Sequence, residues 1–333
     1  MEPTTRHREF LWQAPTMPDP ATLIGRRVTI RYRLHSGSHA STDVVGRVVD
    51  ADCRTILLER RDGSVVSVAG TDVLLLKQVP DRPARSRPAR EVGADDLTRI
   101  TSRGWPAIES VALGEWELRA SGAFTGRANS VAVHGDPGLA ADDAVAAVLD
   151  FYGTRGLTPR AQTVVGSAGE TLFLDAGWAP AQGYRGGAIV QVADLASSPA
   201  HDPRVTVRSA ADDDWLGLYG RVEGQVDEAR AVLEGPARVG FARLGTPVEA
   251  IGRVVVTGEW AGLACVETSP AHRRSGHARA IVESSLAWAV ERGATKAYLQ
   301  TMPENAPALA LYAPYGFVTH HEYRYLVPPA VEA

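Results

Sequence analysis

The chain has 333 residues, a formal net charge of -4, 44% hydrophobic residues and 22% charged residues. This length predicts about two domains, and the apolar content is enough for real cores, which excludes global disorder. The 35 Lys and Arg against 39 Asp and Glu argue against nucleic acid as the main partner. No apolar run is long enough to cross a bilayer, so no membrane partner is expected.

Two further features bear on the compartment. The segment Met1 to Asp19 is polar and contains no signal-peptide core. The two cysteines, Cys53 and Cys265, lie far apart and form no CxxC pair, which fits a reducing compartment and argues against a cysteine-ligated zinc site. We therefore expect a cytoplasmic protein without a metal.

The first ordered block, residues 21–78, alternates between apolar and polar residues. Its short period-two runs are separated by polar turns such as Asp62-Gly63, which predicts a small closed sheet of the SH3-like or Tudor-like kind. The predicted strands are 27–33, 43–49, 55–59, 65–68 and 73–76. Residues 79–92 follow, and their density of Pro and Arg predicts a solvated linker.

The remainder of the chain contains a weak internal repeat. In its C-terminal half, a helix ending at Gly293 is followed by Gln300-Thr301, a short helix and Gly316. In the first half, a helix ending at Gly156 is followed by Gln162-Thr163, a helix-like stretch and Gly177. Four features in the same order indicate a duplication.

The segment from Val266 to Ala278 carries the strongest chemical signal. A predicted strand, 261–268, precedes it, and apolar residues at helical spacing follow it up to Gly293, which is placed to cap the helix. A strand, a tight Arg/Gly turn and a helix N-terminus present free backbone N–H groups, and these suit a pyrophosphate. Other phosphate-loop, dinucleotide and hydrolase motifs are absent from the sequence.

The order Arg-x-x-Gly-x-Ala in this turn resembles the acyl-CoA motif of the GNAT acetyltransferase superfamily. The segments Asn305 to Tyr312 and Tyr315-Gly316-Phe317 match the C-terminal part of such a domain. Together with the segment Phe124 to Ser130, the whole layout resembles a group of actinobacterial acetyltransferases. The resemblance implies an α+β protein in which an SH3-like barrel precedes tandem GNAT-type mixed α/β units, a degenerate one at 93–200 and an acetyl-CoA-binding one at 201–328.

The resemblance also implies roles for individual residues. The strand around Val266 and Thr268 would pair with the pantetheine arm, Asn305 would contact the coenzyme while capping its helix, and Tyr312 would protonate the departing thiolate. The residues implied for the pyrophosphate turn are Arg273, Arg274, Ser275, Gly276, His277 and Ala278. For Tyr312, the competing interpretation is a half-buried tyrosine that packs on Leu309.

The general base stays open. Several GNAT enzymes place a Glu at the position that is Gly262 here, and strand parity puts Glu259 and Glu267 on the opposite face from Gly262. A water or a residue of the first half is the alternative. His272, His277, His320 and His321 are further candidates, because an ordinary imidazole titrates near neutrality, and the last two are expected to be structural.

The first half is expected to be a copy without catalytic function. Asp136, Asp142 and Asp143 would repel a phosphate there, and Phe173 stands where the second half has Tyr312. Trp105, Trp116 and Phe124 are candidates to line the acceptor pocket, although such residues are more often core.

The leading hypothesis is an N-acetyltransferase that moves an acetyl group directly from acetyl-CoA to an amine, either a small molecule or a protein lysine. A non-catalytic acetyl-CoA sensor or partner-recruiting module is the alternative. A nucleic-acid adaptor built on the barrel and linker is a third hypothesis, and the acidic net charge argues against it.

Overall fold

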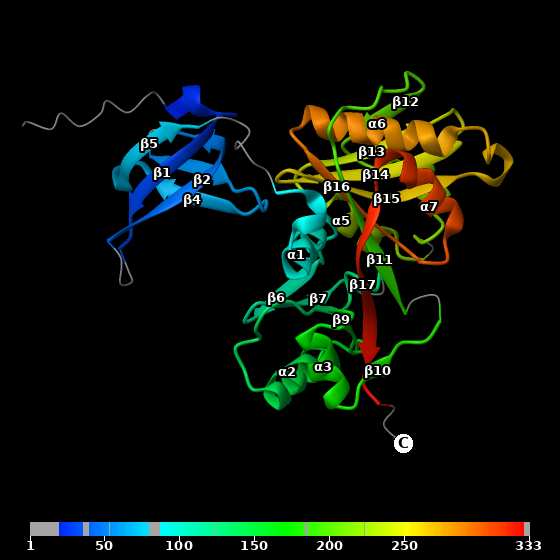
Figure 1. Cartoon of the computed structure of the whole chain (residues 1–333), viewed down its shortest axis with the longest axis horizontal. Helices are drawn as coiled ribbons and strands as arrows, with labels where there is room; N and C mark the ends of the chain where they lie inside the picture. The colour runs from blue at the N-terminus through cyan, green and yellow to red at the C-terminus, as the bar shows by residue number, and fades with distance from the viewer. Residues whose placement is uncertain are drawn as a thin grey trace, which may run out of the picture. The chain divides into compact units, whose positions relative to one another are not determined.

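The structure, a computed structural model, describes residues 20–35, 40–52, 54–79, 87–122, 124–183, 186–222 and 224–329. The chain divides into two compact units, Met1–Arg85 and Ser86–Ala333 (Figure 1). Cys53 and half of the expected linker, residues 80–86, lie outside the described residues, as does the segment Met1 to Asp19. No helix in the described ranges is long and apolar enough to span a membrane.

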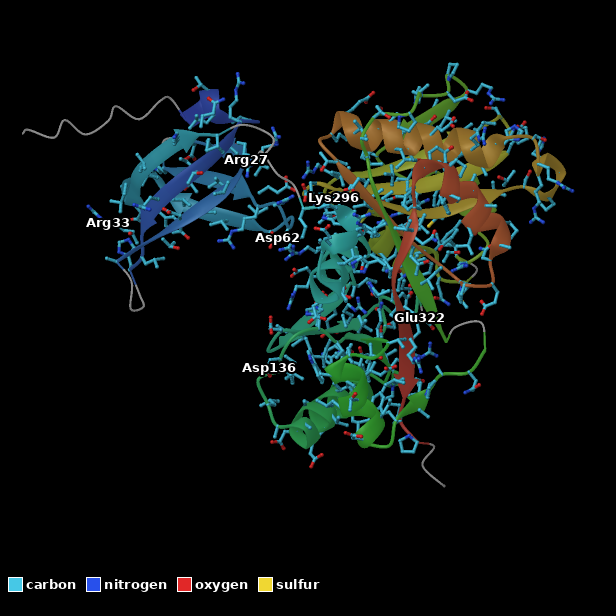
Figure 2. The ribbon with its side chains drawn as sticks, in the orientation of Figure 1. Arg27, Arg33, Asp62, Asp136, Lys296 and Glu322 are labelled. Carbon is cyan, nitrogen blue, oxygen red and sulfur yellow. The ribbon has the colours of Figure 1, made fainter. Side chains whose placement is uncertain are left out.

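The first unit is a five-stranded antiparallel sheet with the order β4-β3-β2-β1-β5. Alternate residues point inward, so that Val28, Ile30 and Val44 are buried while their neighbours face outward. Figure 2 shows Arg27 and Arg33 at the two ends of β1, and Arg31 between them pairs with Asp43 at 2.8 Å. The elements are η1 (Pro20–Leu23), β1 (Arg27–Arg33), β2 (Ser41–Ala51), β3 (Thr55–Glu59), β4 (Val65–Ala69), η2 (Gly70–Asp72) and β5 (Val73–Gln78).

The second unit is built on one 12-stranded mixed sheet. Its main path is β12-β13-β14-β15-β16-β11-β17-β9-β8-β7-β6, and β10 pairs with β17. The strands are β6 (Glu109–Leu113), β7 (Trp116–Ala120), β8 (Val131–Ala132), β9 (Ala161–Val164), β10 (Ala179–Pro180), β11 (Gly187–Asp194), β12 (Val205–Arg208), β13 (Val239–Leu244), β14 (Ala250–Thr257), β15 (Trp260–Thr268), β16 (Lys296–Thr301) and β17 (Val318–Val327).

The two halves of this sheet exchange strands at its centre. The strand β11 belongs to the first half but pairs with β16, while β17 belongs to the second half but pairs with β9. The two strands also pair with each other and run side by side between the halves (Figure 1). Each half also contains one parallel pair of strands, β8 with β9 in the first half and β15 with β16 in the second. Because the halves exchange strands, they form one compact unit. The boundary expected between residues 200 and 201 stays a prediction.

Helices cover both faces of the second half. The long helix α6 lies on β12 to β15, where Ile281 faces Gly252. Arg253, the next residue on β14, points to the opposite face and reaches Gly104 of α1 and Leu233 of α5. The helices are η3 (Ala89–Glu91), α1 (Ala94–Gly104), α2 (Ala141–Gly153), α3 (Ala168–Asp175), α4 (Asp213–Leu218), α5 (Val226–Glu234), η4 (Pro270–His272), α6 (His277–Glu291), α7 (Ala306–Tyr312) and η5 (Ala313–Tyr315).

The end of the expected linker is part of the second unit. Ala89, in η3, is 1% exposed, and its amide donates a hydrogen bond to Asp194 at 2.9 Å. Ala89 is therefore packed, which differs from the expectation of a solvated spacer, whereas Arg87, Arg90 and Glu91 beside it are exposed.

Candidate active site

The parallel strands β15 and β16 separate halfway along their length. Their pairing runs from Trp260 and Lys296 to Leu263 and Leu299, and the described ladder ends there. The rest of β15 continues to pair with β14, up to Thr268 opposite Ala250. One edge of β15 is thereby left open toward the gap, so its backbone can hydrogen-bond an extended ligand, such as the pantetheine arm predicted to lie at Val266 and Thr268.

A β-bulge lies at the point of separation. On β14 the step from Ile251 to Arg253 spans two residues, whereas the facing step on β15, from Glu267 to Ala264, spans three. The extra residue falls in a stretch where Cys265 has a φ of 54°, which is in the left-handed region. A bulge of this kind redirects the side chains that follow it.

The predicted pyrophosphate turn has the expected backbone. Arg274 has a φ of 62°, and Gly276 has a φ of 79° and precedes the first residue of α6, His277. The first amides of a helix have no partner within that helix, and the first turn of α6 carries no acidic residue. The side chains of Arg273, Arg274 and Ser275 are exposed. This turn therefore has the chemistry to bind an anion.

Contacts between partly exposed side chains behind the turn support its shape. The side chain of His277 is directed toward Glu249, with 3.1 Å between its Nε2 and the carboxylate. His272 lies 3.6 Å from the same carboxylate and 2.8 Å from the Ser269 hydroxyl. The two histidines thus support the turn.

A cavity of about 460 Å³ occupies the gap between the separated strands. Of the predicted site residues, Tyr312, Val266 and Asn305 line it, whereas Thr268 and the residues of the turn do not. The lining also includes Phe124, Arg127, Tyr219, Arg221, Gln225, Cys265, Glu267, Gln300, Tyr323 and Tyr325. Both halves of the unit therefore contribute to this cavity.

Tyr312 is buried at the cavity, with 7% of its surface exposed. Its ring meets Phe317 edge-on at 5.6 Å, and burial, together with the nearby Cys265, raises the pKa of its hydroxyl well above the ordinary value. The phenol is therefore protonated at neutral pH and able to donate. The side chain of Asn305 caps α7 by accepting a hydrogen bond from the Ala308 amide at 3.2 Å, which confirms the capping prediction.

The parity argument about Glu267 is wrong, because the bulge inserts one residue between Gly262 and Glu267. The bulge returns Glu267 to the face of Gly262 and Ala264, and Glu267 lines the cavity. It is the one carboxylate among the described lining residues. Burial raises the pKa of Glu267, while the Arg221 guanidinium and the Gly220 amide act in the opposite direction. No sequence signal indicated the bulge, since Cys265 is not a glycine.

The remaining base candidates lie elsewhere. Glu259 pairs with the buried Lys296 at 2.8 Å. His320 contacts the Val92 carbonyl at 2.9 Å and His321 at 2.7 Å, and burial lowers the pKa of His321 to about 4. None of these three side chains lines the cavity, and the two histidines have the structural role that we expected.

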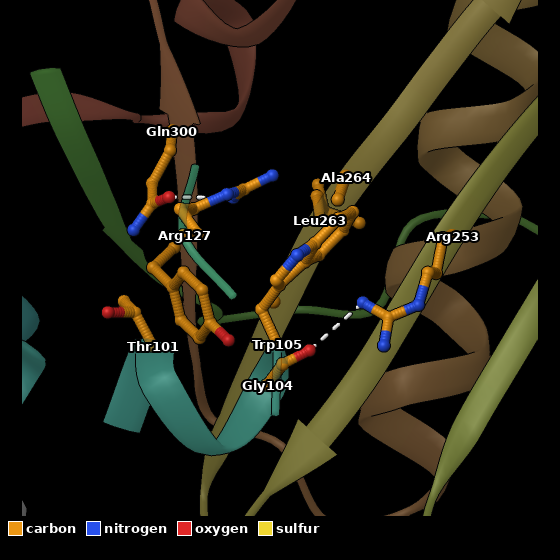
Figure 3. A pocket seen from close by; sticks show the side chains of 10 residues that line it. Thr101, Gly104, Trp105, Arg127, Arg253, Leu263, Ala264 and Gln300 are labelled. Carbon is orange, nitrogen blue, oxygen red and sulfur yellow. Dashed lines mark hydrogen bonds between the residues drawn. The ribbon is translucent and has the colours of Figure 1, made fainter. Parts of the chain in front are cut away.

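The corresponding turn of the first half has the opposite charge. Helix α2 begins with Asp142 and Asp143 in its first turn, and Asp136 lies in the loop before it (Figure 2). Phe173 and Trp116 are buried in the core of this half. Phe124, in contrast, lines the large cavity, and Trp105 lines a small cavity beside it (Figure 3). Arg127, Tyr219 and Arg221 are cavity residues that the sequence analysis did not single out.

Comparison with known proteins agrees with this geometry. The family described as "Probable histone acetyltransferase Rv0428c C-terminal" matches residues 95–326. The chain belongs to this family. Its first unit matches the family "Rv0428c N-terminal Sm-like domain" over residues 22–77, so Sm-like replaces SH3-like or Tudor-like as the description of the barrel.

Individual relatives support the assignment. A protein of Mycobacterium tuberculosis named "Probable histone acetyltransferase Rv0428c" is 31% identical over 92% of this chain and 96% of its own length. The "Uncharacterized N-acetyltransferase YobR" of Bacillus subtilis is 27% identical over 68% of this chain and 96% of its own length. A GCN5-related N-acetyltransferase from Kribbella flavida has the same fold, with a TM-score of 0.52 and 16% identity over 72% of this chain and 96% of that chain.

The family assignment fixes the class of chemistry. The protein is an acyltransferase of the GNAT superfamily, whose members transfer acetyl groups from acetyl-CoA. The separated strands, the turn before α6 and the cavity between them fit such a coenzyme. Within the described ranges, no group of three or more His, Cys, Asp or Glu side chains is placed to hold a metal ion.

Proposed function

We propose that the protein is an N-acetyltransferase that moves the acetyl group of acetyl-CoA directly to an amine. The cavity between β15 and β16 is the observation that carries the proposal, because a buried protonated phenol and a half-buried carboxylate both line it. In this proposal residues 201–328 bind the coenzyme, and residues 93–200 complete the sheet and the acceptor side of the cavity. The acceptor is a small amine or a protein lysine.

In the proposed coenzyme site, the amides of Arg274 to Ala278 bind the pyrophosphate, assisted by the charge of Arg273 and Arg274. The open edge of β15 at Val266 and Thr268 pairs with the pantetheine arm, and Asn305 lies beside it at the start of α7. The support for this placement is the left-handed backbone of Arg274 and Gly276 just before the N-terminus of α6, since turns of this kind often form anion sites.

In the proposed reaction, Glu267 accepts the proton that the acceptor ammonium must lose. The free amine then forms a bond to the acetyl carbon as the carbon–sulfur bond breaks, and Tyr312 donates its proton to the departing sulfur. The nitrogen, now bonded to the acetyl group, gives up its second proton, which returns the Tyr312 phenolate to the phenol and leaves a neutral amide. A raised pKa suits each group, because it makes Glu267 a stronger base and keeps Tyr312 protonated. Direct transfer is supported by Cys265, since burial raises the pKa of its thiol and disfavours the nucleophilic thiolate.

The test combines binding with turnover. Calorimetry measures acetyl-CoA binding, and release of free CoA is followed with a panel of amines for the wild type and for Tyr312→Phe. We expect Tyr312→Phe to bind acetyl-CoA normally and to lose about 100-fold or more in kcat, as is typical for a general acid. Tyr315→Phe is the matched control, because the Tyr315 hydroxyl donates to Glu283 at 2.9 Å and does not line the cavity.

Two results would contradict the proposal. Absence of acetyl-CoA binding would contradict the proposed coenzyme site. Equal turnover by Tyr312→Phe and the wild type would contradict the proposed role of Tyr312 as the proton donor. Tight binding without turnover on any amine would instead favour the non-catalytic acetyl-CoA sensor.

A further inference from the structure

Arg127 is a cavity residue that belongs to the first half of the second unit. It lies in the loop between β7 and β8, and its guanidinium carbon is 4.0 Å from the centre of the Trp105 ring. Its Nη1 donates a hydrogen bond to the Gln300 side-chain oxygen at 2.6 Å, across 173 residues of sequence (Figure 3). Arg127 is thus held at the point where the first-half loop meets β16.

The loop that carries Arg127 is fixed by its own side chains. The Asn129 side chain accepts from the Ser121 amide at 2.7 Å and donates to the Thr125 carbonyl at 3.0 Å. The Trp105 indole donates to the Thr125 hydroxyl at 3.0 Å. The guanidinium of Arg127 is therefore positioned before any ligand arrives, which reduces the entropy lost on binding.

A second guanidinium lies on the same aromatic ring. Arg253 is 1% exposed, and its guanidinium carbon is 5.0 Å from the Trp105 ring centre. Its Nε donates to the Leu233 carbonyl at 2.8 Å and its Nη1 to the Gly104 carbonyl at 3.0 Å (Figure 3). Its Nη2 is buried and has no hydrogen-bond partner among the residues that the structure describes. Arg253 and Arg127 both line a small cavity of about 10 Å³ beside the large one.

Neither guanidinium has an anionic partner among the described residues. The hydrogen bonds given for them go to two backbone carbonyls and one amide side chain, all neutral, and both guanidiniums lie on the Trp105 ring. Burial lowers the pKa of Arg253 to about 10, and the charge of Arg127 acts in the same direction, yet Arg253 is cationic at neutral pH. The charges that act on Glu267, the carboxylate of the large cavity, are those of Arg221 and Arg273 rather than those of Arg127 and Arg253.

The buried positive charge of Arg253 has no counter-ion and is costly, because the low dielectric of the interior does not screen it, and the half-buried charge of Arg127 on the same ring adds to this cost. A carboxylate that docks on Arg127 would relieve this cost and form a charge-assisted hydrogen bond. A lysine-rich protein segment has the opposite charge pattern and would be repelled at the same position.

We propose that the natural acceptor is a small amine that also carries a carboxylate, as an amino acid does, and that Arg127 binds this carboxylate. This inference rests on the proposed function and deepens it by naming the acceptor class. The charge of Arg253 adds to the positive potential behind Arg127. The carboxylate of the acceptor then orients its amine toward the acetyl group in the same cavity.

The acceptor test compares amino acids with their carboxamides, which keep the amine and lose the acidic group. A lysine-rich peptide completes the panel, and CoA release and product mass are measured at saturating acetyl-CoA. We expect kcat/KM to be about 10- to 100-fold higher for a carboxylate than for its carboxamide, the range for a hydrogen bond to a charged group. Equal values for the members of each pair, or a preference for the peptide, would overturn the inference while leaving the proposed function intact.

A variant pair assigns the effect to Arg127. We expect Arg127→Gln to raise KM for the carboxylate acceptor about tenfold or more, without changing KM for the carboxamide or the affinity for acetyl-CoA. Arg292→Gln is the control, because Arg292 lies 3.9 Å from the Trp288 ring centre in the same kind of cation–π contact but outside the cavity. An equal rise in KM for both acceptors with Arg127→Gln would show a structural role and overturn the assignment.

A binding measurement makes the inference independent of turnover. The N-acetylated amino acid, which is the expected product, and its carboxamide are titrated calorimetrically into the full chain in the presence of CoA. Tighter binding of the carboxylate in the wild type, lost in Arg127→Gln, is the expected result. Equal affinities would contradict carboxylate recognition, whereas failure of acetyl-CoA itself to bind would contradict the proposed function.

Discussion

Tyr298 occupies the space that a side chain at Gly262 would need. A Cβ atom at residue 262 would lie 2.4 Å from the Tyr298 hydroxyl oxygen, and one at Gly104 would lie 1.9 Å from it. Tyr298 is buried, which raises the pKa of its hydroxyl to about 12, and its ring lies against the backbone of β15. The position at which several GNAT enzymes place a glutamate is therefore closed to any side chain in this protein.

The first prediction concerns the stability of this contact. Gly262→Ala should lower the free energy of unfolding by about 1–3 kcal/mol, the usual cost of overpacking a core. For a unit of this size, the melting temperature should fall by about 2–4 °C for each kcal/mol. Differential scanning calorimetry measures the change. Gly217→Ala is the control, since Gly217 lies in α4 with no atom within 4 Å of a Cβ there, and it should not be destabilised.

Unchanged melting of Gly262→Ala would mean that Tyr298 moves aside easily. In that case the closure of position 262 would no longer explain why the base has to come from another residue.

The second prediction concerns Glu267 as the base. Because its pKa is raised, the ionised form accumulates only at higher pH, and kcat/KM should rise with pH through that raised pKa. Glu267→Gln should lose about 100-fold or more in kcat and should also lose this limb of the pH profile. Steady-state rates between pH 5 and 9 provide the measurement. A variant that keeps the same limb would assign the titration to another group.

The raised pKa of Glu267 should also make the stability of the folded protein depend on pH. A folded-state pKa above the unfolded value means that the folded protein holds the proton more tightly, so stability is highest at low pH and falls as pH rises through the folded pKa. Glu267→Gln should therefore melt at a higher temperature than the wild type at pH 8, and the difference should shrink toward pH 4. A difference that grows toward low pH would contradict the direction of the pKa shift.

The third prediction separates direct transfer from transfer through an acetylated cysteine. Cys265 lines the cavity and contacts Tyr219, and burial raises its pKa, so the thiol should not attack the thioester. Cys265→Ser should keep kcat within about tenfold of the wild type. Intact-protein mass spectrometry after mixing with acetyl-CoA should show no added acetyl group. Loss of turnover in a folded Cys265→Ser protein that still binds acetyl-CoA would support the covalent route instead.

The sequence predicted the local elements well, because their causes are local. The strand 27–33 matches β1 to the residue, since alternate burial gives a strict period of two. The helix expected to end before Gly293 is α6, and Gly293 has the φ of 90° that suits a glycine cap. The acyl-CoA motif could be recognised for the same reason, because its residues are consecutive in the sequence and form a single turn.

Features that depend on tertiary contacts could not be predicted. The bulge at Cys265 reverses the face of Glu267, yet it is set by pairing with β14 rather than by a turn residue. Arg127 reaches Gln300 only because the halves share one sheet, and the exchange of β11 and β17 that joins them leaves no periodic signal. The closure of position 262 likewise needs Tyr298, which is 36 residues away (298 − 262).

The fourth prediction tests the pyrophosphate turn with a matched pair of glycines at the two ends of α6. Gly276 and Gly293 have φ values of 79° and 90°, and neither has an atom within 4 Å of a Cβ position. Alanine should therefore strain the backbone similarly at both sites, by about 1–2 kcal/mol. Only at Gly276 would the added methyl group also stand between the backbone amides and a bound diphosphate.

We therefore expect Gly276→Ala to weaken acetyl-CoA binding about tenfold or more, as the loss of charge-assisted hydrogen bonds implies, and Gly293→Ala to leave it unchanged. Calorimetric titration measures both affinities, and thermal melting verifies that the two variants lose similar stability. If both variants bind acetyl-CoA as tightly as the wild type, the diphosphate binds elsewhere. A loss of affinity in both would show that strain in α6, rather than contact at its N-terminus, controls binding.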